Sequence, residues 1–191
     1  YYTTEYGEGY AADKTKAKAV KRTWEECRGI GKSFGFNRNE DFEDYQRTEQ
    51  LIHLLVTIVS KGGNLLLDIG PAADGTIPVI MQERLIEMGR WLSLNGEAIY
   101  GSHSWRLQEE KPNICYTSKG NTVYAIVLNW PGEELILRSP RATDRTRIEL
   151  PGYSNTLKYS VKEDGLHISL PPSPPAGNCG YAYVFKLTGV E

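Results

Sequence analysis

A short apolar segment between two helical patterns restricts the fold of this chain more than any other feature of its sequence. The run NLLLDIG, residues 64–70, shows no alternation of polar and apolar side chains. Such a run is typical of a strand covered on both faces, as in a parallel sheet. Apolar side chains recur at three- and four-residue spacing in residues 41–60 before it and in residues 78–94 after it. Helix, buried strand and helix in this order predict an α/β sheet with crossover connections.

Both predicted helices carry signals for their ends. Asp44 and Thr48 are alternative N-caps for the first helix, and Gly62 suits the left-handed position after its end. Pro78 suits the first position of the second helix, and the Asn-Gly pair 95–96 is expected to end it. These signals predict two separate helices, one on each side of the strand in sequence.

After about residue 100 the helical period disappears. Strand-like runs follow at residues 121–130, 134–140, 146–150, 157–170 and 181–190. The pair Asp164-Gly165 is expected to form a two-residue hairpin turn. The run PPSPPAG, residues 171–177, is a stiff connection that cannot lie in a central strand. Residues 101–191 are therefore predicted to form an antiparallel β-sandwich.

Residues 1–100 do not suffice for a complete parallel sheet. They provide two or three strands, and a parallel sheet needs both faces covered and neighbours for its strands. Left alone, the predicted strand and helices would expose a large apolar surface. We expect that they belong to a larger α/β domain or that a partner chain completes them, and the absence of Met at position 1 favours the larger domain.

Composition excludes several classes of function. The formal net charge of -2 gives no electrostatic reason to expect nucleic acid or an anionic membrane as a partner. No apolar run reaches the length of a membrane span. Cys27, Cys115 and Cys179 show neither metal-ligand spacing nor a disulfide framework.

The three histidines do not suggest a metal or cofactor site. His53 lies in the apolar stripe of the first helix and is interpreted as a packed or rim residue. His103 and His167 have no partner at ligand spacing. No Ser-His-Asp set and no phosphate-binding glycine loop occurs, so no metal and no cofactor is expected.

Several stretches together resemble one enzyme family. They are SKGGNLLLDIGPAADGTIP at 60–78, QERLIEMGRWLSLNGEAIYGS at 82–102, TWEECRGIGKSFGFNRNE at 23–40 and the ending YAYVFKLTGVE. Over essentially its whole length the chain resembles the α-L-fucosidases of glycoside hydrolase family 29. The resemblance implies a (β/α)8 barrel followed by a C-terminal β-sandwich. Residues 1–100 would then be the last part of the barrel and 101–191 the sandwich, with an N-terminal barrel portion as the missing partner.

The resemblance also implies the chemistry. Enzymes of this family are retaining, so one carboxylate attacks the anomeric carbon while another protonates the leaving oxygen and later deprotonates water. The nucleophilic Asp of the family has no match here and is expected upstream. The run TTEY places Glu5 at the position of the general acid/base. A solvated chain end is the alternative for Glu5, and Glu8, Glu25 and Glu26 are the rival carboxylates.

Further residues are weaker candidates for the binding site. Trp24 and Phe36, together with Phe34, are candidates for an apolar wall that stacks on a deoxy sugar, with core packing as the alternative. Arg28 and Arg38 are candidates for contacts with the leaving group, with a solvated surface as the alternative.

One further position departs from the family. Asp68 stands where the family commonly has Asn, at the end of a barrel strand. It is interpreted as an acceptor that anchors a loop, because a carboxylate cannot donate as an amide does.

The function predicted is that of a retaining α-L-fucosidase acting on a fucosylated glycan or small fucoside, inactive as this piece alone because the nucleophile is absent. The alternative is a non-catalytic carbohydrate-binding or structural module. A related glycosidase with another sugar specificity is a third possibility. The sequence also leaves open whether the protein forms a homo-oligomer. No Asn-x-Ser/Thr acceptor occurs, which favours a bacterial periplasmic or secreted protein, or a lysosomal one if eukaryotic.

Overall fold

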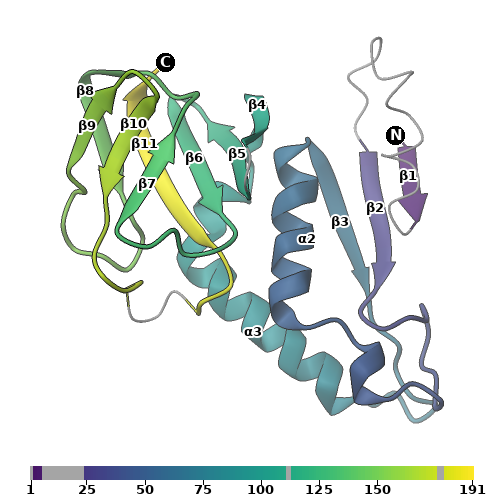
Figure 1. Cartoon of the computed structure of the whole chain (residues 1–191). Coiled ribbons are helices and arrows are strands. Elements are labelled where there is room, and N and C mark those ends of the chain that lie inside the picture. The colour runs from purple at the N-terminus through teal and green to yellow at the C-terminus, as the bar shows by residue number, and fades with distance from the viewer. Residues whose placement is uncertain (1, 6–23, 111–112, 176–178) are drawn as a thin grey trace. The chain divides into compact units, whose positions relative to one another are not determined.

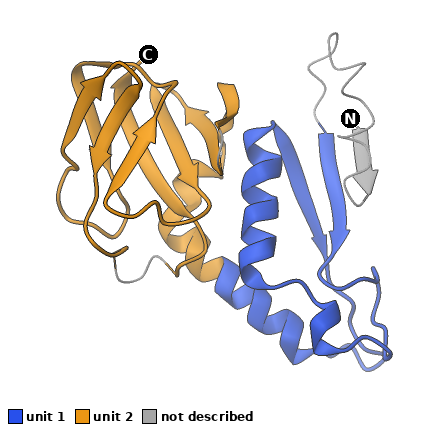
Figure 2. Ribbon diagram, viewed as in Figure 1, with its two compact units in different colours: residues 1–88 blue, residues 89–191 orange. Residues whose placement is uncertain are grey.

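The computed structural model of the chain describes residues 2–5, 24–110, 113–175 and 179–191, and of residues 2–5 the backbone alone. The chain divides into two compact units, residues 1–88 and 89–191 (Figure 2). The division falls within one helix, and each unit is described by itself.

Unit 1 contains a three-stranded parallel sheet in the order β1-β2-β3. Its elements are β1 (Tyr2–Glu5), β2 (Trp24–Gly29), the 3-10 helix η1 (Phe42–Asp44), α2 (Thr48–Ser60), β3 (Gly63–Asp68) and the first part of α3 (Val79–Asn95). Figure 1 shows α2 running alongside β3, where it forms the crossover between two neighbouring parallel strands. The predicted order of helix, strand and helix is confirmed. The expected cover on both faces of β3 is not, because Asn64 and Leu66 are exposed.

The two faces of this sheet differ. Every second residue of β2 faces the helix: Trp24, Glu26 and Arg28. Together with residues of α2 they line a cavity of about 140 Å³. Glu25, Cys27 and Gly29 therefore take the opposite, open face, in register with Asn64, Leu66 and Asp68 of β3. Leu66 on the open face is 49% exposed, so this apolar side chain lacks the cover that a parallel strand normally has.

Helix α2 begins differently from the expectation. Its N-cap is Arg47, whose backbone N–H donates to Gln50 Oε1 at 2.8 Å. The prediction of Asp44 or Thr48 as the cap is therefore wrong. Thr48 is the first helical residue and its hydroxyl donates to the Glu87 carboxylate, whereas Asp44 Oδ2 accepts the Asp41 N–H at 2.9 Å in the preceding 3-10 turn.

The other helix ends follow the sequence signals. Gly62 has a φ of 78° directly after the C-cap of α2, the left-handed conformation predicted for it. The carbonyl of Pro78 accepts the N–H groups of Met81 and Gln82, and α3 ends at Asn95, before Gly96.

Unit 2 consists of two antiparallel sheets, β4-β5-β6-β11-β8 and β7-β10-β9. Its elements are η2 (Gly96–Ala98), β4 (His103–Glu110), β5 (Ile114–Lys119), β6 (Thr122–Val127), β7 (Glu134–Leu137), β8 (Ala142–Glu149), β9 (Tyr159–Lys162), β10 (Gly165–Ser169) and β11 (Tyr183–Val190). Buried side chains of both sheets form one core, which includes Leu137 and Ile168 from the smaller sheet and Val127 and Phe185 from the larger one. Unit 2 is thus a β-sandwich, as the strand-like runs predicted, although β4 and β5 were not predicted individually.

The hairpin predicted around Asp164-Gly165 is confirmed, but its two turn residues are Glu163 and Asp164, because Gly165 already pairs with Lys162 as the first residue of β10. Gly165 has a φ of 143°, and a Cβ there would come within 2.5 Å of the Leu137 carbonyl oxygen on β7. Gly165 therefore allows both the positive φ after the turn and the close approach of β7.

None of the helices in the described ranges is long and apolar enough to cross a membrane.

Candidate active site

The carboxyl edge of the unit 1 sheet is the candidate active site. Parallel α/β sheets bind their ligands at the carboxyl ends of the strands, on the loops that follow them. Strands β2 and β3 end at Gly29 and Asp68. The Ile30 N–H donates to the Asp68 carbonyl at 3.2 Å, and the Gln46 N–H donates to the Ile30 carbonyl at 3.0 Å. Backbone hydrogen bonds thus hold the ends of the loop between β2 and α2 against the sheet edge.

Two loops touch at this edge. A Cβ at Gly70, in the loop after β3, would overlap the backbone of Gly35 and Phe36 in the loop after β2. Phe36 is 39% exposed and Phe34 is half-buried on the same loop. Both phenylalanines therefore lie at the carboxyl edge, and their role as an apolar wall stays a prediction.

Glu40 fixes the shape of the loop from inside. Its Oε1 accepts the Ser33 N–H at 2.6 Å. Gly31 leaves the necessary space, because a Cβ there would lie 2.6 Å from Glu40 Oε2. Burial and then the charge of Glu40 raise the pKa of the Tyr45 hydroxyl. The carboxylate thus holds together the two halves of the loop that carries Phe36.

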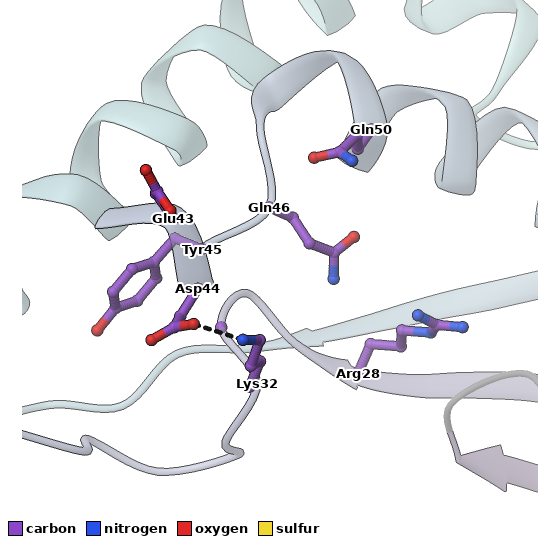
Figure 3. Close-up of a pocket in the computed structure, with 8 residues that line it drawn as sticks. Arg28, Lys32, Glu43, Asp44, Tyr45, Gln46 and Gln50 are labelled. Carbon is purple, nitrogen blue, oxygen red and sulfur yellow. Dashed lines mark hydrogen bonds and ion pairs between the residues drawn. The ribbon is translucent and has the colours of Figure 1, made fainter. Parts of the chain in front are cut away.

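A polar pocket of about 330 Å³ lies between the end of β2 and the start of α2. Its lining residues are Arg28, Gly31, Lys32, Glu43, Asp44, Tyr45, Gln46 and Gln50 (Figure 3). The Lys32 ammonium lies 2.5 Å from Asp44 Oδ1. This hydrogen bond raises the pKa of Lys32 and lowers that of Asp44.

The alternation of β2 separates the two adjacent carboxylates. Glu26 is buried on the helix face, where its Oε1 accepts from Arg28 Nε at 2.9 Å. Glu25 is on the open face. Sequence alone could not decide which of the two carboxylates is buried, and the structure shows that it is Glu26. Arg28 therefore has an ionic partner, while Arg38 is exposed.

Trp24 lies at the amino end of β2, five residues before Gly29, which is about 16 Å along a strand. Its Nε1 donates to the Lys61 carbonyl at 3.3 Å. A Cβ at Gly63 would overlap the indole ring, so the ring packs directly on the backbone of β3. This position favours the packing role that was the alternative for Trp24.

The acid/base candidates lie at the margin of the described chain. Glu5 is the last residue of β1 and its Cα is in register with Cys27, two residues before the end of β2. The side chain of Glu5 lies outside the described residues, and so does Glu8. Asp68 ends β3, and the loop contact described above uses its backbone carbonyl.

His167 has partners that its sequence neighbourhood did not suggest. In unit 2 its Nε2 lies 2.7 Å from Asp164 Oδ1 and its Nδ1 lies 3.0 Å from Glu134 Oε1. These hydrogen bonds raise the pKa of His167. The sequence shows no partner for His167 at metal-ligand spacing, and the fold brings Glu134 to it from β7. No group of three metal-ligating side chains occurs in the part of the chain that the structure describes.

Comparisons with known proteins agree on one family. A family model described as alpha-L-fucosidase matches residues 2–97, and one described as the alpha-L-fucosidase C-terminal domain matches residues 108–188. Human tissue alpha-L-fucosidase is 46% identical over 186 residues, which cover 94% of this chain and 40% of that protein.

Solved structures give the same answer. The crystal structure of Thermotoga maritima alpha-fucosidase in complex with a mechanism-based inhibitor is similar with a TM-score of 0.80 and 33% identity, over 98% of this chain and 42% of that one. A trapped covalent intermediate of a Bacteroides thetaiotaomicron GH29 alpha-L-fucosidase, in complex with 2-fluoro-fucosyl fluoride, is similar with a TM-score of 0.72 and 25% identity, over 88% of this chain and 38% of that one. The chain thus spans about two fifths of the length of these relatives.

Proposed function

The chain belongs to the α-L-fucosidase family, glycoside hydrolase family 29, and on that premise we propose that it is the C-terminal portion of a retaining enzyme that hydrolyses terminal α-L-fucosyl linkages. The observation that carries the proposal is the match of both family models along a chain whose parallel sheet presents its loops at one carboxyl edge.

We assign residues 1–100 to the last part of a (β/α)8 barrel and residues 101–191 to the accessory sandwich. Three parallel strands in sequential order, with a helix crossing between β2 and β3, are what neighbouring strands of such a barrel look like. The exposed Leu66 on the open face supports this assignment, because the remaining barrel would cover it.

The retaining mechanism has two steps. A carboxylate of the upstream portion attacks the anomeric carbon as the acid/base protonates the departing glycosidic oxygen, which releases the leaving group and forms a fucosyl-enzyme. The same acid/base then takes a proton from water, whose oxygen attacks the anomeric carbon and releases fucose. A covalent intermediate was trapped in the Bacteroides relative, which supports this route.

Glu5 is our candidate for the acid/base. The TTEY run and the position of its backbone, at the carboxyl end of β1, support that role. Phe36 is our candidate for an apolar surface against the deoxy sugar, and Trp24 stabilises the strand at the opposite edge. The chain alone, lacking the nucleophile, would be inactive.

For localisation we favour a secreted or lysosomal destination of the eukaryotic type. The similarity to human tissue alpha-L-fucosidase supports this.

Turnover of 4-nitrophenyl α-L-fucoside by the full-length protein that contains this chain tests the function. We expect wild-type turnover, and for Glu5→Ala a loss of about 100-fold or more, the usual contribution of a general acid/base. Azide should restore activity by attacking the fucosyl-enzyme in place of water, giving a fucosyl azide with the anomeric configuration of the substrate.

Glu8→Ala is the matched control. Normal activity of Glu5→Ala together with a loss in Glu8→Ala would transfer the acid/base role to Glu8. A wild-type protein that turns over no fucoside would favour the non-catalytic module instead.

A further inference from the structure

Asp68, the last residue of β3, carries a carboxylate that has no role in the mechanism above. We propose that this carboxylate is a fixed negative charge of the active site, which keeps the general acid/base protonated near neutral pH. Asp68 is then a positioning residue, which acts through its charge on the acid/base. The inference rests on the proposed function, with Glu5 as the acid/base, and adds the group that sets the upper pH limit of the reaction.

The strand register places Asp68 on the face that the proposed barrel encloses. Asp68 pairs with Gly29, and both lie on the open face of the sheet, as does Leu66 two residues earlier. In Figure 1 the arrowheads of β2 and β3 lie together at the carboxyl edge, where Asp68 ends its strand. Residues at this end of barrel strands are the ones that form the active site of such a barrel.

The fold leaves the side chain of Asp68 without a described partner. The Ile30 N–H donates to the backbone carbonyl of Asp68 at 3.2 Å, so the main chain anchors the loop after β2. Among the described residues, the Asp68 carboxylate makes neither a hydrogen bond nor an ion pair. The residue is nevertheless half-buried. A partly buried carboxylate without a partner costs free energy, and such costs are typical of functional positions.

One loop covers this end of β3 from two sides. A Cβ at Gly29 would lie 2.5 Å from the Ser33 carbonyl oxygen, so the loop after β2 folds directly over the residue that pairs with Asp68. A Cβ at Gly70 would overlap the backbone of Phe36, so the same loop packs on the segment after Asp68. Charges that are shielded from water are screened less than charges at an open surface. The field of the carboxylate is therefore expected to reach across the edge of the sheet.

Other charges around this edge do not replace that of Asp68. The titratable and charged side chains of the surrounding elements are the exposed Arg38 and Asp74, together with Glu25, Cys27, Lys32 and Glu40. The Lys32 ammonium is 2.5 Å from Asp44 Oδ1, so its charge is compensated. Glu40 Oε1 accepts the Ser33 N–H at 2.6 Å. Glu25 precedes the end of β2 by four residues, about 13 Å along the strand.

The backbone gives the distance over which the charge acts. The Glu5 Cα is in register with Cys27, and Cys27 with Leu66, so Asp68 is two strands across and two residues further along. With strands about 4.8 Å apart and a rise of about 3.3 Å per residue, the two Cα atoms are about 12 Å apart. A carboxylate opposes the ionisation of another carboxyl group. At this distance, and at an effective dielectric constant of about 20 to 40, it raises the pKa of the acid/base by about 0.5 to 1.

The test is the pH profile of kcat/KM for the full-length protein with phenyl α-L-fucoside. Phenoxide is a poor leaving group, so cleavage needs the protonated acid/base, and the basic limb of the profile reports its pKa in the free enzyme. Asp68→Asn keeps the shape of the side chain and removes its charge. We expect the basic limb of this variant to lie about 0.5 to 1 pH unit below that of wild type.

Three further variants are matched to this one. Asp68→Glu keeps the charge and should keep the wild-type limb. Asp68→Ser removes the charge with a smaller polar side chain and should shift the limb in the same direction as Asp68→Asn. Glu83→Gln removes one negative charge at an exposed position of α3 and should leave the limb unchanged.

The outcomes separate the inference from the proposed function. A wild-type basic limb in both neutral variants of Asp68, or an equal shift in Glu83→Gln, would overturn the inference. Failure of both neutral variants to fold, seen in their Tm, would also overturn it, because the carboxylate would then have a structural role. A wild type that hydrolyses no α-L-fucoside would overturn the proposed function itself.

Discussion

The two units differ in how completely each buries its own apolar residues. In the sandwich, two sheets enclose a common core in which Leu137, Ile148 and Phe185 have no exposed surface. In the parallel unit, α2 covers one face, while Leu66 on the open face is 49% exposed. An antiparallel sandwich supplies both of its own layers, whereas a parallel sheet depends on elements beyond its strands. Unit 2 therefore encloses its own core, whereas unit 1 leaves an apolar side chain of its sheet exposed.

The largest effect is expected in the sandwich core. Phe185→Ala in β11 should lower the free energy of unfolding by about 3 to 5 kcal/mol, because a fully buried ring leaves a cavity. Urea denaturation of the present chain, followed by circular dichroism in the β region, measures it. A loss below about 1 kcal/mol would show that the sandwich core is less closely packed than the structure has it.

Leu66→Ala tests whether unit 1 lacks part of its cover. Its effect on stability should depend on whether the present chain or the full-length protein is measured. In the present chain it should cost less than about 1 kcal/mol, since the side chain is half exposed. In the full-length protein, where we propose that further strands cover it, the cost should rise to about 2 to 4 kcal/mol. Equal effects in both proteins would contradict the assignment of the open face to a barrel interior.

A pH dependence is expected in the sandwich through His167. Both ring nitrogens face carboxylates, so the imidazolium is the form that can donate to Asp164 and Glu134 together. Lys162 is the other charged group at the ring, 3.1 Å from Nδ1. The folded pKa of His167 is raised, so the stabilisation is complete below its unfolded pKa and is lost as pH rises through the folded pKa.

Asp164 and Glu134 set the lower limit of the pH range in which these hydrogen bonds stabilise the fold. The His167 hydrogen bonds lower the pKa values of Asp164 and Glu134, so their contribution is lost as pH falls through those folded values. The Tm of wild type should therefore be highest near pH 5 to 6 and fall toward pH 8 more steeply than that of His167→Gln. Parallel curves for the two proteins from pH 5 to pH 8 would contradict this account.

An effect confined to unit 1 is expected at the turn between α2 and β3. Gly62→Ala introduces a Cβ at a φ of 78°, which should cost about 1 to 2 kcal/mol. Hydrogen exchange should show the loss in the amides of α2 and β3 and leave β6 and β11 as protected as in wild type. A matched loss of protection in both units would show that they unfold together.

Much of this fold could be predicted because the signals are local. The apolar run of β3, the stripe of α2 and the turn that precedes Gly165 each depend on a few adjacent residues. Strand β4 was not predicted because its pairing with β5 is irregular between Ser104 and Glu109, which disrupts the alternation. The cap at Arg47 could not be foreseen because the side chain of Gln50 supplies the contact.

The candidate site could be predicted only in part. Motifs pointed to Glu5 and Phe36, but the pocket combines polar residues from β2, its loop and the start of α2, none of which stands out in sequence. Glu25 and Glu26 are adjacent, and only the pairing with β3 decides which faces the helix. Long-range pairing of this kind is what a single sequence does not display.

The central claim is that this chain forms part of a retaining α-L-fucosidase whose nucleophile lies outside residues 1–191. Incubation of the full-length protein with 2-fluoro-fucosyl fluoride, followed by digestion and mass spectrometry, tests it most directly. We predict one stoichiometric fucosyl adduct on a carboxylate in a peptide upstream of Tyr1. An adduct on a carboxylate of residues 1–191, or no adduct in a protein that hydrolyses fucosides, would contradict the account.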